Sequence, residues 1–162
     1  MSTAGQIDVV TLRLGGEWMA LPADSLREIL EPVAVTRVPL SRAFSNGLIN
    51  VRGVVVPLTD LRVAFGMPPA TATEDTRMLV FDVPLDGETV TVAITADKVY
   101  EVTTLDVSTL DEVPSVGLRW PPEFVQGIGM QQDEFLLVPD LEAIFKQHAM
   151  RGTTQKQPDE GM

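Results

Sequence analysis

Residues 44–65 read Phe-Ser-Asn-Gly-Leu-Ile-Asn-Val-Arg-Gly-Val-Val-Val-Pro-Leu-Thr-Asp-Leu-Arg-Val-Ala-Phe, and residues 124–145 read Phe-Val-Gln-Gly-Ile-Gly-Met-Gln-Gln-Asp-Glu-Phe-Leu-Leu-Val-Pro-Asp-Leu-Glu-Ala-Ile-Phe. Aligned without gaps, the two stretches share both terminal phenylalanines, the first glycine and an Asp-Leu pair. A similarity of this length predicts one supersecondary unit that is used twice. The copies differ where the first has Asn50-Val51-Arg52-Gly53 and the second has Met130-Gln131-Gln132-Asp133. Shared positions are typical of a scaffold, so the differing polar positions are better candidates for function.

The same order of short apolar runs and turns precedes each copy. Residues 9–14 end at Gly15-Gly16, and residues 78–83 are followed by Asp86-Gly87, so both runs predict β-hairpins. Residues 23–29 are then mirrored by residues 96–102, with Asp24 matching Asp97 and Glu28 matching Glu101. Ser25 and Glu28 have the spacing of a capping box, which predicts a short helix beginning at residues 24–28.

These patterns predict a mainly β protein made of two similar small β-barrels, with short helices, from an internal duplication. We expect a flexible N-terminus over residues 1–6, one domain over residues 7–150, and a disordered tail over residues 151–162, which lacks apolar residues. Within the domain, subdomains of about 10–66 and 78–148 are expected to exchange strands, because neither half makes a large core alone.

Composition narrows the range of functions. The chain has 162 residues, of which 44% are hydrophobic, enough for a core, and a net charge of −11, which argues against nucleic-acid binding. It has no cysteine and a single histidine, so disulfides, thiolate chemistry and histidine clusters are not expected. No apolar run approaches the roughly 18–20 residues that a membrane span needs, and the N-terminus lacks the features of a secretory signal. We therefore expect a cytoplasmic protein without direct membrane insertion.

The stretch Asn50-Val51-Arg52-Gly53 has two interpretations. It is either a turn before a core strand, with a solvated arginine, or a binding element, because arginine often anchors protein interfaces. The run Val54-Val55-Val56-Pro57-Leu58 is apolar at every position and predicts a buried strand.

Other polar residues fit structural roles better than chemical ones. Asp60 and Asp140 occupy equivalent positions before short helices, so capping is favoured over a catalytic carboxylate pair. His148 is expected to be solvated. Three acidic residues around the second hairpin turn lack the spacing of a calcium loop. With no nucleophile–base pair, metal cluster or phosphate loop, the sequence favours a binding or adaptor module without a cofactor over an enzyme.

The stretch Gly47-Leu-Ile-Asn-Val-Arg-Gly-Val-Val-Val-Pro-Leu-Thr-Asp-Leu-Arg62 closely resembles the signature of the CheW family, the bacterial chemotaxis coupling proteins. The resemblance extends over roughly residues 7–147. It implies two intertwined SH3-like barrels and no catalysis. It also implies a scaffold that bridges the chemotaxis histidine kinase to methyl-accepting chemoreceptors, in membrane-associated or cytoplasmic receptor arrays.

The resemblance also implies where the partners bind. One barrel would pair with the regulatory domain of the kinase through an apolar strand surface. A groove between the barrels would receive the cytoplasmic hairpin tip of the receptor. Carried over by position, the receptor-facing candidates are Leu26, Glu28, Gly47, Asn50 and Arg52. The kinase-facing candidates are Val33, Val35 and Val38.

Two alternatives remain open from the sequence. The chain could be a CheW-like regulatory piece of a larger signalling protein, although its length leaves no room for a second domain. It could also be a small-ligand sensor that uses the groove between the barrels, although no residue pattern demands this.

Overall fold

The computed structural model describes residues 5–39, 43–45, 47–112 and 121–150, the side chains of residues 149 and 150 excepted. In this part of the chain, short strands predominate, and each repeated stretch ends in a short α-helix. The elements are β1 (Gln6–Leu14), β2 (Glu17–Pro22), β3 (Leu26–Leu30), β4 (Thr36–Arg37), β5 (Gly47–Val51), β6 (Val54–Thr59), α1 (Leu61–Ala64), β7 (Arg77–Leu85), β8 (Glu88–Ala96), β9 (Lys98–Asp106), β10 (Val125–Gln131), β11 (Glu134–Pro139) and α2 (Leu141–Phe145).

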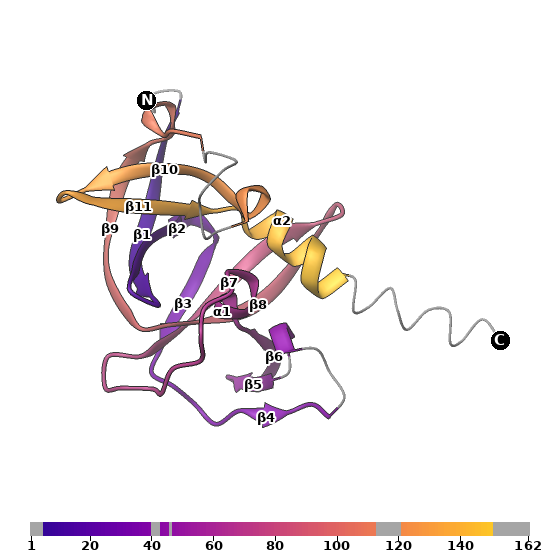
Figure 1. The fold of residues 1–162 in the computed structure, drawn as a ribbon. Coiled ribbons are helices and arrows are strands. Elements are labelled where there is room, and N and C mark those ends of the chain that lie inside the picture. Colours follow the sequence, from indigo (N-terminus) through magenta and orange to yellow (C-terminus); the bar gives the residue numbers. More distant parts are fainter. Residues whose placement is uncertain (1–4, 40–42, 46, 113–120, 151–162) are drawn as a thin grey trace.

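The strands form two curled sheets, and each sheet takes strands from both halves of the sequence (Figure 1). One has the order β10-β11-β2-β1-β9 and is called the five-stranded barrel below. The other has the order β3-β7-β8-β6-β5-β4 and is called the six-stranded barrel. Without β4 the second order reads β5-β6-β8-β7-β3, which is the same arrangement with the halves interchanged. The predicted mainly β fold of two intertwined barrels from a duplication is therefore confirmed.

Within each barrel the two halves are joined by one parallel pairing and by one antiparallel pairing, β1 with β9 or β3 with β7. Leu58 of β6 pairs with Ala93 of β8, and Leu137 of β11 pairs with Met19 of β2. The other strand pairings are antiparallel. Each parallel contact brings together strands from different halves, so neither barrel is complete without the other half of the chain.

The largest hydrophobic core lies between the barrels. It contains fully buried side chains from both sheets, such as Leu21, Phe81 and Ile94, together with Phe145 of α2. Two smaller clusters, one around Trp18 and one around Ile49, belong to the individual barrels. Because most of the apolar area is buried between the sheets, the hydrophobic effect holds the two barrels together as one unit.

The helices begin as the sequence predicts. The Asp60 carboxylate accepts a hydrogen bond from the backbone N–H of Arg62 at 3.0 Å, and the Asp140 carboxylate accepts one from that of Ala143 at 3.1 Å. The backbone N–H groups of Asp60 and Asp140 donate to the carbonyls of Phe44 and Phe124, each at 2.8 Å. The capping role predicted for both aspartates is confirmed, and the repeated geometry explains why the Asp-Leu pair recurs.

The chain crosses between the barrels at two equivalent points, after β2 and after β8. At the second crossing, the Asp97 carboxylate accepts a hydrogen bond from the Gly15 N–H at 2.8 Å and forms an ion pair with Arg62 of α1. The Asp97 N–H donates to the Arg13 carbonyl at 2.9 Å. Arg62 is 9% exposed, so this ion pair links the two barrels at a nearly buried site.

The predicted helix start at residues 24–28 is wrong. Residues Ala23–Ser25 form one 3₁₀ turn without a side-chain cap, and Leu26–Leu30 is strand β3. Glu28 pairs with Val80 of β7, so it has no part in a capping box. The sheet offers this segment backbone partners and apolar contacts that an isolated turn lacks, and tertiary pairing therefore overrides the local capping signal.

Two further expectations need correction. The predicted buried strand, now β6, begins with Val54 and Val55, which are 60% and 63% exposed. The pairing with β8 starts only at Leu58, so the first part of β6 has a neighbouring strand on one side only. His148 is half-buried rather than solvated, and its ring stacks on Phe44 with centroids 4.8 Å apart.

The expected boundaries of the domain and of its terminal segments can be compared with the structure only at the N-terminal side. Strand β1 already begins at Gln6, within the segment expected to be flexible. Residues 1–4 and the predicted tail, residues 151–162, lie outside the described residues. Helix α2 continues into a π-helical segment over Lys146–Met150.

Candidate functional site

The candidate site from the differing stretch lies at the rim of the six-stranded barrel. Arg52 lies in the turn between β5 and β6 with a φ of 53°, and its side chain is 77% exposed. It forms an ion pair with Glu28 of β3, a side chain that is 22% exposed. The fold thus brings together two predicted receptor-facing residues from distant parts of the sequence. The outer face of the guanidinium stays open to solvent.

Asn50 shapes the turn that presents Arg52. Its side-chain oxygen accepts a hydrogen bond from the Gly53 N–H at 2.8 Å, and Gly53 has a φ of 86°. Two successive residues with positive φ are typical of the tight hairpin turn that joins neighbouring antiparallel strands. The stretch therefore forms a turn before β6, with Asn50 at the end of β5 holding the turn and Arg52 exposed within it.

Leu26 lies beside this rim and connects it to the interior. Leu26 is partly buried and packs against the core between the barrels, whereas Ile29 on the same edge strand is 44% exposed. Glu28 pairs with Val80 and Ile29 with Leu79, so the two side chains point to opposite faces of β3 and Ile29 lies away from the ion pair. Ile29 is not among the receptor-facing candidates predicted from the sequence.

Gly47 is buried, and the segment of residues 31–39, called the link, packs against it. A Cβ atom added at Gly47 would lie 2.7 Å from Cγ1 of Val35. Gly127 in the second copy is approached by Leu110 in the same way, at 2.9 Å. The glycine that both copies share therefore allows close packing of a link against a strand.

We expect Gly47→Ala to lower the free energy of unfolding by about 1–2 kcal/mol, because the added methyl overpacks against Val35. Denaturant unfolding would measure this. In the Gly47→Ala background, Val35→Ala should recover part of the loss, because it removes the clashing methyl groups. If the two substitutions are simply additive in a double-mutant cycle, the proposed contact is not the cause.

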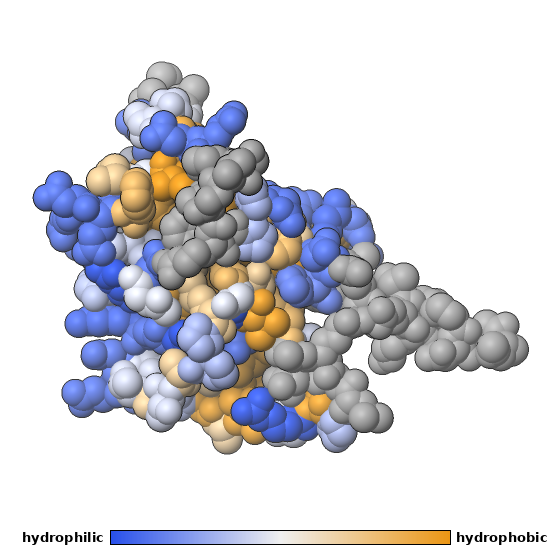
Figure 2. All heavy atoms as spheres, in the orientation of Figure 1, coloured by the Kyte–Doolittle hydropathy of each residue, from blue (hydrophilic) through white to orange (hydrophobic). Residues whose placement is uncertain are grey.

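The kinase-facing candidates have unequal exposure. Val33 is 38% exposed, while Val35 packs against the core of the six-stranded barrel and Val38 is partly buried. The structure adds Val54 and Val55, which are the most exposed valines of this barrel. Figure 2 shows apolar side chains reaching the surface over β5 and β6. The all-apolar sequence of β6 concealed this exposure, because it resembles a fully buried strand.

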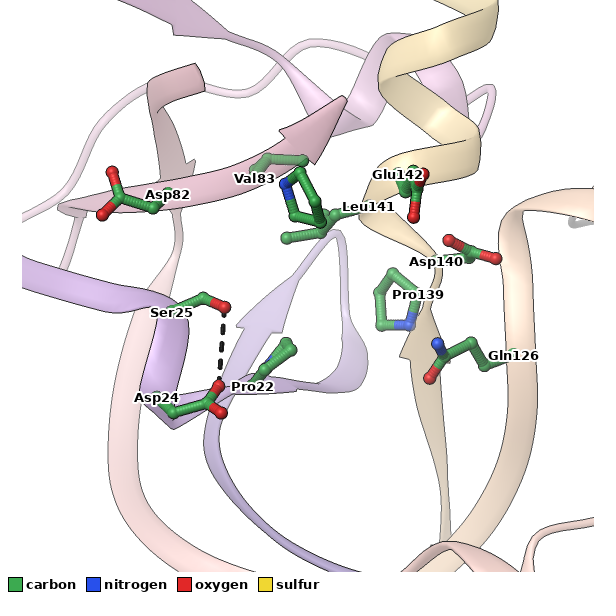
Figure 3. A pocket seen from close by; sticks show the side chains of 11 residues that line it. Pro22, Asp24, Ser25, Asp82, Val83, Gln126, Pro139, Asp140, Leu141 and Glu142 are labelled. Atoms are coloured by element: carbon green, nitrogen blue, oxygen red, sulfur yellow. Dashed lines mark hydrogen bonds between the residues drawn. The ribbon is translucent and has the colours of Figure 1, made fainter. Parts of the chain in front are cut away.

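A hollow of about 230 Å³ lies where α2 approaches the first crossing between the barrels. Four carboxylates line it, from Asp24, Asp82, Asp140 and Glu142 (Figure 3). They do not converge on one point, since Asp82 lies on the opposite side of the hollow from Asp140. Asp140 caps α2 and Asp82 accepts a hydrogen bond from Thr91 at 2.8 Å. Asp140 and Asp82 therefore have structural roles.

The described residues give no sign of a metal centre or a membrane span. Among them, no group of three or more His, Cys, Asp or Glu side chains is placed to hold a metal ion. Within the same ranges, no helix has the length and apolar character required to cross a bilayer.

Comparison with known proteins places this architecture in context. The model of the CheW-like domain matches residues 8–149. The chemotaxis protein CheW of Klebsiella aerogenes is 29% identical over 148 residues, covering 91% of this chain and 86% of that protein. The CheW of Helicobacter pylori is 31% identical over 133 residues, covering 82% of this chain and 78% of that protein.

A solved structure is also similar. The crystal structure of the scaffolding protein TtCheW from Thermoanaerobacter tengcongensis aligns with a TM-score of 0.75 and 26% identity, covering 86% of this chain and 87% of that one. The similarity reaches beyond proteins named for chemotaxis. Protein PilI of Pseudomonas aeruginosa is 25% identical over 142 residues, covering 87% of this chain and 73% of that protein.

Proposed function

The chain belongs to the CheW family, and from that premise we propose how its surfaces serve a chemotaxis coupling adaptor. In this proposal, the rim of the six-stranded barrel that carries Glu28, Asn50 and Arg52 binds the cytoplasmic tip of a methyl-accepting chemoreceptor. Leu26 supplies apolar contact, and Gly47 supports the adjacent link. The exposed valines of the link and of β6 bind the regulatory domain of the chemotaxis histidine kinase.

The observation that carries the receptor half of this proposal is the exposed ion pair between Arg52 and Glu28. Glu28 orients the guanidinium, which leaves a planar set of N–H donors facing solvent. Such a group is suited to carbonyl or carboxylate oxygens on a partner helix.

The kinase half rests on the position of the exposed valines. Val33 lies on the link, and Val54 and Val55 begin β6. They belong to the same barrel as Arg52 but carry no charge. The proposal requires that a receptor and a kinase bind the adaptor at the same time. We further propose that the protein acts as a scaffold without catalysis, in the cytoplasm at receptor arrays.

Reconstitution from purified parts tests this function. The full chain is mixed with a receptor cytoplasmic fragment and with the kinase regulatory domain, first separately and then together. We expect a binary complex with each partner and one ternary complex that contains all three proteins. Binding to neither partner would refute the coupling role, and mutually exclusive binding would refute the division into two surfaces.

A substitution on the link tests the kinase surface. Val33→Asp should weaken binding of the kinase regulatory domain about tenfold, because a charge is placed in an apolar contact. Receptor binding should stay unchanged. Val63→Asp on α1 is the matched control, because Val63 is 39% exposed and Val33 is 38% exposed. Equal losses for both variants in titration calorimetry would contradict the assignment of Val33.

A further inference from the structure

The open end of the five-stranded barrel contains a cavity of about 430 Å³. Its lining includes two aromatic residues, a carboxylate and two side-chain amides, from Trp18, Tyr100, Glu101, Gln131 and Gln132. The lining comes from β2, from β9 and from the hairpin between β10 and β11. None of these residues belongs to the receptor or kinase surfaces proposed above.

This cavity is the counterpart of the rim that carries Glu28 and Arg52. Both edge strands have an irregularity in their pairing at the same place. The pairing of β3 with β7 shifts register between Leu26 and Glu28. The pairing of β9 with β1 shifts register opposite Thr11, whose hydroxyl donates a hydrogen bond to the Glu101 carbonyl. The hairpin turns also agree, since Arg52 has a φ of 53° and Gln132 a φ of 51°. By position in the duplicated unit, Glu101 therefore corresponds to Glu28, and Gln132 corresponds to Arg52.

The two rims differ in charge pairing. Arg52 forms an ion pair with Glu28, whereas Gln132 is neutral and offers no positive charge to Glu101. In the part of the chain that the structure describes, the Glu101 carboxylate has no ion pair and accepts no hydrogen bond. The turn beside it is strained, because Gln132 and Asp133 both have positive φ values, where the first copy has glycine at the second of these positions. The second copy therefore has the strained turn and the glutamate, Glu101, but has Gln132 in place of the arginine.

The aromatic side of the cavity favours a cation. Tyr100 is 44% exposed and lies against Trp18, with ring centroids 4.6 Å apart. Each ring of this pair already lies close to a cation. The Arg13 guanidinium lies 4.1 Å over the Trp18 ring, and the Lys98 ammonium lies 5.2 Å from the Tyr100 centroid. Arg13 is neutralised by Glu134, with both oxygens at 2.9 Å, so it is not available to Glu101.

We propose that this cavity is a docking site for an arginine side chain of a protein partner. The guanidinium binds the Glu101 carboxylate as Arg52 binds Glu28 in the other barrel, stacks on the exposed face of Tyr100, and donates to the side-chain oxygens of Gln131 and Gln132. The net charge of −11 favours the approach of a basic segment. The adaptor thereby gains a contact beyond the receptor and the kinase surfaces.

Peptide titration tests this site without either partner of the coupling function. Because the chain has two tryptophans, Trp120→Phe leaves Trp18 as the only one, and its fluorescence then reports on the cavity. The probes are a blocked Gly-Arg-Gly peptide and the same peptide with citrulline, the neutral isostere of arginine. We expect saturable binding of the arginine peptide, with at least about tenfold weaker binding of the citrulline peptide. Equal binding of both probes, or none, would overturn the proposal.

Two variants place the binding on the named residues. Glu101→Gln should remove the preference for arginine over citrulline. Gln132→Arg should supply the missing guanidinium within the chain and so block the arginine peptide. The matched control is Gln126→Arg, which adds the same charge at an exposed glutamine of β10 and should bind the peptide as before.

Unchanged peptide binding in Gln132→Arg would overturn the proposal, even if Glu101→Gln failed to fold, because Gln132 is exposed in a turn. The titrations contain neither receptor nor kinase. Their outcome therefore stands apart from that of the reconstitution experiment.

Discussion

Replacing Arg52 with glutamate should weaken binding of the receptor fragment by at least about 30-fold, which corresponds to about 2 kcal/mol or more. The variant removes the planar donors of the guanidinium. It also places a second carboxylate beside Glu28, and like charges in such proximity repel each other and the acceptor groups of the partner. Because Arg52 is an exposed turn residue, its loss should leave the fold and kinase binding intact.

Calorimetric titration with the receptor fragment and with the kinase regulatory domain measures both effects. Lys146→Glu is the control, since it makes the same change of two charge units at an exposed residue following α2. If Lys146→Glu weakens receptor binding as much as Arg52→Glu does, the loss reflects overall charge rather than a specific contact. Loss of kinase binding in Arg52→Glu would refute the separation of the two surfaces.

Asp97→Ala should lower the free energy of unfolding by about 2–4 kcal/mol. The substitution leaves the Arg62 guanidinium, with a side chain that is 11% exposed, without its ion-pair partner. It also removes the acceptor of the Gly15 N–H at the turn between β1 and β2. The partial exposure of Asp97, at 38%, keeps the expected loss below that of a fully buried pair.

The duplication provides a matched control for this prediction. Asp24 occupies the equivalent crossing after β2, but the position that corresponds to Arg62 is Glu142 in the second copy. Asp24 therefore has no arginine partner there, and Asp24→Ala should change stability by no more than about 0.5 kcal/mol. Urea unfolding of both variants decides the matter. Equal losses would show that the ion pair with Arg62 contributes nothing specific.

Much of the architecture could be predicted because it depends on local signals that occur twice. The glycine turns, the Asp-Leu pairs and the alternating apolar runs predicted hairpins, caps and a duplicated β unit. Alignment of the two repeats also singled out Arg52, which differs between the copies and is exposed in the structure. These features depend on nearby residues and on positions that both copies share.

The remainder depends on contacts between distant segments. The segment from Leu26 to Leu30 has a helical capping signal, yet pairing with β7 makes it a strand. Val54 and Val55 are exposed because β8 does not reach them, which no local pattern reveals. The ion pair between Arg62 and Asp97 joins residues on a helix and at a crossing. Its only sequence signal was the replacement of Arg62 by glutamate in the second copy.

The exchange of strands between the halves also affects how the protein can change over generations. A recombination event within the segment that joins the two repeats would replace parts of both barrels at once, because each barrel is built from both repeats. Neither barrel can therefore be inherited as a separate unit. Variation in recognition has to arise at the hairpin tips, where a substitution alters one face and spares the shared interior.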